Sequence, residues 1–265
     1  MGESFFTFED ALKLVGGRHL TKVKLYRLAK EGYIRPVKRG LYQIVPIQYL
    51  DKEPPFDKFL LGRELSQPYH FSHHSALEIH GVSNAAIFNT VYISSPRQFR
   101  SLKYGGVEYV WVRNVSSFGV EDVVWSDKTV HVSDRERTIL DCLQRIDLAG
   151  GFEEAYKSVI SFPSIDLDKL YQYLEKISRK SLFCRVGFFL SLEEVRDRWH
   201  VTDDFLEKLK KIVDKKTYYF AAEKGHGRLV KEWNLVVPDN IEALMSHGRC
   251  HRSSTLRERL QRQVS

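Results

Sequence analysis

The sequence predicts an α+β protein in which a small helical head with a β-hairpin precedes a larger mixed α/β domain. Two observations predict this class. The first fifty residues show helical spacing of apolar residues twice, and then two short alternating segments around a glycine turn. Farther on, three segments rich in β-branched and aromatic residues precede a long stretch of helical periodicity. With 265 residues, 43% of them hydrophobic, the chain is long enough to bury a core.

The head is predicted to begin with a helix within residues 5–15. Thr7 can cap its first turn, and Asp10 stands three residues later, as in a capping box. The pair Gly16-Gly17 then ends the helix, because glycine accepts the left-handed backbone that closes a helix. We therefore expect a tight turn at these two glycines.

A second helix is predicted over residues 22–31, with Thr21 as its N-cap. Four basic side chains lie outside its apolar stripe: Lys22, Lys24, Arg27 and Lys30. The segments 33–37 and 41–45 then alternate around Lys38-Arg39-Gly40, which is typical of a β-hairpin with a basic turn.

A helix, a tight turn, a basic helix and a basic hairpin together form the layout of a winged helix-turn-helix. A helix of this kind fits the major groove of double-stranded DNA, where its polar side chains reach base edges. The hairpin turn, with Lys38 and Arg39, can lie against phosphates or enter the minor groove. The alternative is a helical hairpin and β-ribbon that only dock on the rest of the protein. The sequence favours DNA binding, because the positive charge falls where the groove-facing surfaces are expected.

The charge distribution also indicates a polyanionic partner. The chain carries a formal charge of +7, to which residues 1–50 contribute +5 and residues 246–265 contribute +4. The segment between them is close to neutral, at −2. A near-neutral body with a basic head and a basic tail is the pattern of a module that meets a polyanion. Scattered basic residues that only keep the surface soluble are the alternative explanation.

The predicted domains are residues 1–48 as a winged helix, 49–56 as a linker, 57–240 as a mixed α/β domain and 241–265 as a basic tail. Pro54-Pro55 among charged residues marks the linker. The tail loses all periodicity, so we expect it to be disordered.

The α/β domain is expected to begin with two helices and to continue with strands, then helices, then a final strand pair. We predict helices at 56–66 and 72–80, strands at 89–95, 107–113 and 129–133, helices from 133 to about 213, and strands within 216–221 and 232–238. Ser133 and Glu136 form the capping box of the helix that follows residue 133.

No catalytic signature, metal site or cofactor motif is predicted. Four histidines lie close together in the sequence: His70, His73, His74 and His80. Their spacing is not that of a zinc site, and we expect them to hydrogen-bond locally. A metal-dependent nuclease needs an acid and a lysine two positions apart on one strand, whereas Asp127 and Lys128 are adjacent.

The compartment predicted from the sequence is the cytoplasm. The chain has no run of about 18 apolar residues, so we expect no membrane span. Its start lacks the pattern of a secretory signal peptide. The cysteines Cys142, Cys184 and Cys250 are far apart and form no CxxC pair, which favours a reducing setting.

Several segments of the chain occur in a recognisable order. The head carries FTFEDALKL and LYRLAKEGYIRPVKRGLYQI, and the body carries SALEIHGV, VYISSP, VHVSDRERTILDCL, GGFEEAYKSV and CRVGFFLS. In this order they resemble the AbiEi-type antitoxins of type IV toxin–antitoxin systems, over roughly residues 6–237. The run from SDRERTILDCL through GGFEEA to RVGFFL is the most specific part of the resemblance.

The resemblance implies a transcriptional repressor and antitoxin without catalytic activity. Its winged helix would bind the promoter of its own operon, double-stranded DNA expected to carry inverted repeats. Its C-terminal domain would counteract a nucleotidyltransferase-like toxin without forming a stable complex. From the motifs and the resemblance together, the predicted DNA-binding residues are Thr21, Lys22, Lys24, Arg27, Arg35, Lys38 and Arg39.

Two other functions stay open at this stage. The chain could be a solitary regulator that senses a ligand or a partner and has no toxin. It could also be a nucleic-acid-processing enzyme that its head only brings to the substrate. An adjacent gene for a nucleotidyltransferase-like protein would separate the first from the antitoxin, and metal-dependent cleavage of labelled DNA or RNA would reveal the second.

Overall fold

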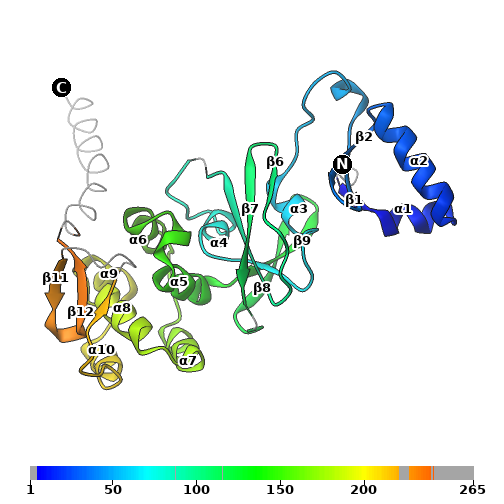
Figure 1. Cartoon of the computed structure of the whole chain (residues 1–265). Coiled ribbons are helices and arrows are strands. Elements are labelled where there is room, and N and C mark those ends of the chain that lie inside the picture. The colour runs from blue at the N-terminus through cyan, green and yellow to red at the C-terminus, as the bar shows by residue number, and fades with distance from the viewer. Residues whose placement is uncertain (1–4, 87, 115, 221–226, 240, 242–265) are drawn as a thin grey trace, which may run out of the picture. The chain divides into compact units, whose positions relative to one another are not determined.

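The chain is an α+β protein made of two compact units. A computed structural model describes residues 5–86, 88–114, 116–220, 227–239 and 241 (Figure 1). Within this range, the first unit contains residues up to 75 together with 88–133, and the second contains 76–86 together with the residues from 134 onward. The predicted head thus shares a unit with the strands that follow it, and the units do not divide at the predicted boundaries near residues 48 and 56.

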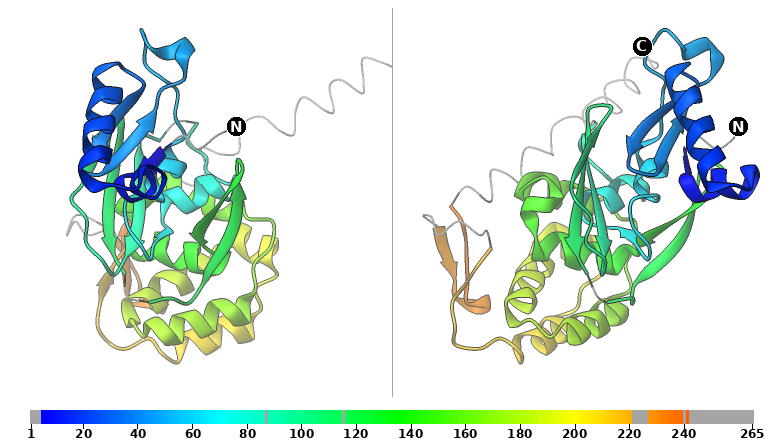
Figure 2. Two further views of the ribbon diagram at one scale, coloured as in Figure 1. Left: turned by 90° about the vertical axis from the view of Figure 1, so that its right-hand side faces the viewer. Right: turned by 45° about the vertical axis from the view of Figure 1, so that its right-hand side comes forward.

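Three strands and two helices make up the head, which is blue in Figures 1 and 2. They are β1 (Phe5–Thr7), α1 (Phe8–Val15), α2 (Arg18–Lys30), β2 (Ile34–Lys38) and β3 (Leu41–Ile44). The strands form an antiparallel sheet in the order β1-β3-β2. A small core of Ala11, Leu25 and Ile34 holds the helices against this sheet.

The capping box predicted at the start of α1 is confirmed. The backbone N–H of Asp10 donates to the Thr7 hydroxyl at 3.2 Å, and the backbone N–H of Thr7 donates to the Asp10 carboxylate at 2.9 Å. Two otherwise unpaired backbone donors of the first turn are satisfied in this way. The Thr7 hydroxyl also donates to the Asp10 carboxylate, at 2.6 Å, and this hydrogen bond, followed by that of the Thr7 backbone N–H, holds the pKa of Asp10 below its usual value.

The second helix begins four residues earlier than predicted, at Arg18. Gly16 ends α1 with a left-handed backbone (φ +82°), and Gly17 is the N-cap of α2. The prediction that Thr21 caps this helix is therefore wrong. Thr21 lies one turn inside α2, where its hydroxyl donates to the Gly17 carbonyl at 2.8 Å. The error arises because a glycine N-cap has no side chain by which the sequence can be recognised.

The C-terminal end of the predicted linker is packed against neighbouring residues of the first unit. After the short helix η1 (Ile47–Tyr49), the ring of Phe56 makes edge-to-face contacts with Phe5 and Tyr104, at centroid distances of 6.3 and 5.4 Å. A Cβ at Gly105 would lie only 2.1 Å from this ring, so the approach requires glycine. These contacts fix the end of the segment, which is not a free linker.

A six-stranded mixed sheet forms the rest of the first unit, with the strand order β6-β7-β5-β4-β9-β8. Its elements are α3 (Lys58–Gly62), β4 (His70–Phe71), β5 (Thr90–Ser95), β6 (Leu102–Tyr104), β7 (Val107–Arg113), β8 (Val120–Trp125) and β9 (Lys128–Ser133). The predicted strands are confirmed as β5, β7 and β9, and the predicted helix near residues 56–66 is the shorter α3. Strands β4, β6 and β8 are not predicted from the sequence. Because β6 and β8 are edge strands, they carry little of the apolar signal of a buried strand.

The second unit is mainly helical. Its boundary with the first falls inside α4 (His74–Ile79). The elements after residue 134 are α5 (Arg135–Gln144), η2 (Ile146–Ala149), α6 (Phe152–Ile160), α7 (Leu167–Ile177), α8 (Lys180–Ser191), α9 (Glu193–Trp199), α10 (Asp203–Lys210), β10 (Tyr218–Tyr219), β11 (Gly227–Val230), η3 (Lys231–Trp233) and β12 (Leu235–Pro238). The predicted run of helices is confirmed, and the final strand pair is present as β10 and β12 with β11 added to it.

The capping residue of α5 differs from the prediction. Asp134, and not Ser133, is the N-cap, because its carboxylate accepts the backbone N–H of Arg137 at 2.9 Å. The Glu136 carboxylate accepts the backbone N–H of Asp166 at 2.9 Å, at the start of α7. The predicted capping box of Ser133 and Glu136 is therefore wrong, and Glu136 instead connects two helices.

The α8 helix is almost entirely buried, and one glycine allows another element to pack on it. A Cβ at Gly187 would lie 2.0 Å from the ring of Trp233, which is fully buried. The apolar residues of the RVGFFL segment thus belong to the core of the second unit. The predicted basic tail, residues 241–265, lies outside the described residues except for Ile241, which is buried.

Candidate nucleic-acid interface

The α2 helix presents basic side chains to solvent around most of its circumference. Lys22, Lys24, Arg27 and Lys30 are all exposed, as the sequence predicts. Lys22, Lys24 and Lys30 form no ion pair with another described residue. Their positive charge is therefore not neutralised within this part of the chain and is available to an anionic partner.

Arg27 differs from its neighbours on α2 because it has a carboxylate partner. Its Nε donates to Glu31 at 2.8 Å, one helical turn away. This hydrogen bond raises the pKa of Arg27. Both side chains are exposed, so the pair can open at little cost when a phosphate competes for the guanidinium.

The structure separates the three predicted hairpin residues into two groups. Lys38 is half-buried and donates to the Leu65 carbonyl at 3.1 Å, and burial lowers its pKa. Arg35 donates to the Lys52 carbonyl at 3.0 Å and pairs with Glu53 at 3.3 Å. Both side chains fasten the hairpin to residues that follow it in the chain. Only Arg39 is exposed without an ion pair among the described residues.

Thr21 does not belong to any surface of the head. It has no exposed area, and its hydroxyl is used inside α2. The prediction that Thr21 contacts DNA is therefore wrong for the conformation described here, since a buried side chain cannot reach a partner.

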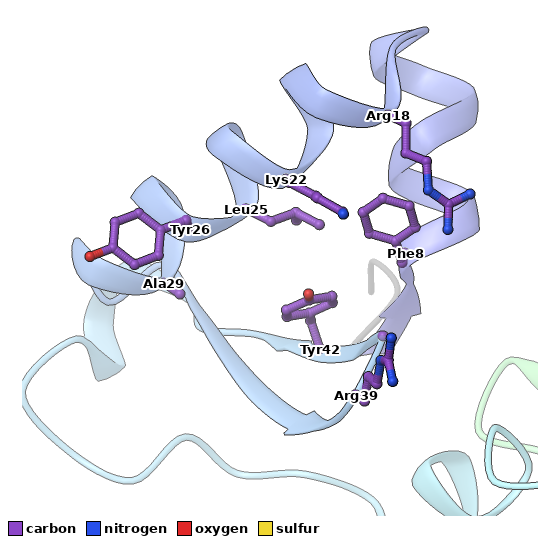
Figure 3. A pocket seen from close by; sticks show the side chains of 9 residues that line it. Phe8, Arg18, Lys22, Leu25, Tyr26, Ala29, Arg39 and Tyr42 are labelled. Carbon is purple, nitrogen blue, oxygen red and sulfur yellow. The ribbon is translucent and has the colours of Figure 1, made fainter.

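A groove of about 570 Å³ lies between α2 and the hairpin (Figure 3). Arg18 and Lys22 border it on the helix, and Arg39 borders it at the hairpin turn. Phe8 from α1 and Tyr42 from β3 also line it, and the Arg18 guanidinium lies 5.5 Å from the centre of the Phe8 ring. This distance is within the range of a cation–π interaction.

Arg18 and the apolar side chains that share the exposed surface of α2 are not among the predicted site residues. Arg18 lies before the predicted start of the helix at residue 22. Tyr26 is 73% exposed, and Leu20 and Val23 are about half exposed. The sequence signal for these apolar residues is that α2 carries more of them than the small core of the head can bury. Apolar groups on a groove-facing helix can contact the methyl group of thymine.

In the histidine-rich segment, His73 has the local hydrogen bond that the sequence predicts. The Nδ1 of His73 lies 2.8 Å from the Ser72 hydroxyl, and His74 stacks on Phe88 with ring centroids 3.7 Å apart. His70 lies 3.2 Å from the Asn114 side chain. No group of three or more His, Cys, Asp or Glu side chains that could hold a metal occurs among the described residues.

Asp127 lies in the turn between β8 and β9, next to the first residue of β9. It is therefore not aligned on a strand face with Lys128. Cys142 and Cys184 are free thiols and are buried. Within the described part of the chain, none of the helices combines the length and the apolar character that crossing a membrane requires.

The fold has a solved counterpart. The chain is similar to the crystal structure of the RV2827C protein from Mycobacterium tuberculosis, with a TM-score of 0.64 and 15% sequence identity. The similarity covers 91% of this chain and 88% of that one. At this identity the likeness shows a shared fold alone. No family model matches the sequence, and no curated protein matches it.

Proposed function

We propose that residues 5–45 form a winged helix-turn-helix that binds double-stranded DNA. The observation that carries the proposal is the order of elements in the head: two helices joined at Gly16-Gly17, followed by a hairpin, with strands in the order β1-β3-β2. In this arrangement α2 is the helix that enters the major groove, and the hairpin is the wing. Lys22, Lys24 and Arg39, which form no ion pair among the described residues, lie on these two elements.

The proposed contacts differ in kind along the interface. Lys22, Lys24 and Arg27 on α2 reach phosphates and base edges, and Arg39 reaches a phosphate from the wing. Arg35 and Lys38 act indirectly, because they hold the hairpin in place through the carbonyls of Lys52 and Leu65.

We further propose that the chain represses its own operon in the cytoplasm and is the antitoxin of a type IV toxin–antitoxin system. This part of the proposal rests on the resemblance of the sequence motifs to AbiEi-type antitoxins. The toxin would be a nucleotidyltransferase-like protein, counteracted without a stable complex. Expression of an adjacent gene of that kind should arrest growth, and co-expression of this chain should restore it.

The DNA-binding part is tested by a gel-shift titration against the DNA upstream of the gene, with scrambled DNA of equal length as competitor. The parent should prefer the upstream fragment at near-physiological salt. Replacing Lys22, Lys24 and Arg39 together with Ala should weaken binding at least tenfold. It should also reduce the slope of log affinity against log salt by about 3, or about 1 for each lost phosphate contact.

The matched control removes three exposed lysines of the second unit, Lys211, Lys215 and Lys216, and so changes the net charge equally. It should leave the affinity and the salt slope nearly unchanged. Equal losses in both triple variants would mean that the chain binds DNA through its net charge alone, which would contradict the proposed interface.

A further inference from the structure

The groove between α2 and the hairpin has two chemically different ends (Figure 3). At one end, Arg18 and Lys22 lie beside Phe8, and Arg39 lies below them at the hairpin turn. Toward the other end, the groove is bordered by Tyr42 and by Leu25, next to Tyr26. None of the three cations has a carboxylate partner among the described residues. A ligand that matches the groove therefore needs a negative charge at one end and a flat apolar body at the other.

We propose that this groove binds a small planar aromatic anion, of the chemical class of the nucleoside monophosphates. Its volume, about 570 Å³, is within the range of pockets for small molecules, roughly 300–1,000 Å³. The phosphate would lie among Arg18, Lys22 and Arg39, where charge-assisted hydrogen bonds form. The base would stack on the aromatic side chains, as bases do on other stacking platforms.

The charge of the groove argues against a purely apolar occupant. An apolar peptide or an apolar face of a second copy that filled the whole groove would bury Arg18, Lys22 and Arg39 without a counter-charge, which is costly. An aromatic anion satisfies both ends at once.

Ligand binding would also weaken DNA binding, an inference that rests on the proposed function. Lys22 and Arg39 border the groove and also belong to the proposed DNA interface, whereas Lys24 and Arg27 do not line the groove. A bound phosphate would occupy Lys22 and Arg39, so ligand and DNA would compete for them. The chain would then bind its operator less tightly when the ligand is abundant.

The probe for the test is adenosine 5′-monophosphate, titrated into the full chain by calorimetry at low salt. We expect saturable binding with a Kd of about 1 mM or tighter. Inorganic phosphate and adenosine should each bind at least about tenfold more weakly, because each offers only one of the two features. Phosphate binding as tightly as the nucleotide would reduce the groove to an anion patch and overturn the proposal, and so would a nucleotide that does not saturate.

Two variants test whether the nucleotide binds in the groove. Arg18→Gln should lower the affinity about tenfold, as expected for a lost charge-assisted contact. Arg18 is exposed, so the head should stay folded. Lys24→Gln is the matched control, because it removes one charge from the same helix outside the groove. Equal losses in both variants would show a long-range charge effect and would overturn the proposal.

Tyr42→Leu should also weaken nucleotide binding, by about fivefold, through lost stacking. Because Tyr42 stacks on Phe6, its thermal unfolding must be compared with that of the parent. A variant that unfolds leaves the Arg18→Gln comparison as the deciding measurement.

The outcomes separate this inference from the proposed function. Nucleotide binding with the expected variant pattern, in a chain that does not prefer its upstream DNA, would support the ligand site and contradict the repressor. Operator binding without nucleotide binding would support the repressor and contradict the ligand site. If both occur, adding the nucleotide should weaken the gel shift of the parent.

Discussion

The head and the second unit use charged side chains in opposite ways. In the head, Lys22, Lys24 and Arg39 are exposed and have no ion pair within the described chain. In the second unit, Arg137 and Asp141 are only 7% and 9% exposed, and they pair at 2.8 Å on α5. Charge that is exposed and not neutralised is available to a partner. Charge that is buried and paired within the chain serves the architecture.

The same contrast holds where α5 meets α7. Lys169 lies 3.1 Å from the Asp134 carboxylate and 2.9 Å from the Glu136 carboxylate, and the Tyr173 hydroxyl donates to Asp134 at 2.9 Å. Partial burial alone would lower the pKa of Lys169, but the hydrogen bonds to Glu136 and Asp134 raise it. These side chains join α5 to α7, and the ammonium group of Lys169 is already paired with two carboxylates.

The largest expected effect comes from breaking the buried pair of α5. Arg137→Met leaves the Asp141 carboxylate buried without its cation, so the free energy of unfolding should fall by about 3–5 kcal/mol. The matched control is Arg145→Met, because Arg145 pairs with Asp147 and both side chains are more than half exposed. That variant should lose at most about 1 kcal/mol. Urea unfolding followed by circular dichroism measures both, and similar losses would contradict the distinction between the two kinds of charge.

A second effect, of intermediate size, appears at alkaline pH. Burial and the hydrogen bond to Asp134 raise the pKa of Tyr173 to about 12, from an ordinary value of 10.0. The folded state therefore holds this proton more tightly than the unfolded state. The stability that it contributes is complete below about pH 10 and is lost as the pH rises toward 12.

Tyr173→Phe removes this titration together with the hydrogen bond. The variant should be less stable than the parent at pH 7, by about 1 kcal/mol. It should then lose less additional stability than the parent between pH 9 and pH 11.5, which urea unfolding at each pH measures. Lys169 remains in both proteins and titrates in the same direction, so it does not create the difference. Parallel losses in the two proteins would show that Tyr173 is not an alkaline-sensitive group.

Local signals in the sequence predict much of the fold. Thr7 and Asp10 predict the start of α1 because a capping box depends on two residues three positions apart. The glycine at position 40 predicts the hairpin turn, where the backbone has φ +79°. Strands β5, β7 and β9 are predicted because their segments are rich in β-branched and aromatic residues. The edge strand β8 is not predicted, because Glu121 and Asp122 interrupt its apolar pattern.

The candidate site depends more on tertiary contacts, which a local pattern does not contain. Lys38 and Arg39 are adjacent and equally basic in the sequence, yet only Lys38 reaches the carbonyl of Leu65. Thr21 has the residue type of an N-cap, but a preceding glycine takes that role. The groove requires Phe8, Lys22 and Tyr42, which come from three different elements. Only their arrangement in space brings the cations and the aromatic rings together.

The smallest expected effect sharpens the comparison at Arg27, the cation of α2 that pairs with a carboxylate among the described residues. Arg27 donates to Glu31, so within the head it resembles the paired charges of the second unit. Glu31→Gln removes that carboxylate and frees the guanidinium for a phosphate. The affinity for operator DNA should rise about twofold, since an exposed pair of this spacing is weak. The control is Glu193→Gln, which makes the same charge change on an exposed residue of the second unit. An equal gain in both variants would assign the effect to net charge, whereas a gain in Glu31→Gln alone would mean that Arg27 contacts the DNA.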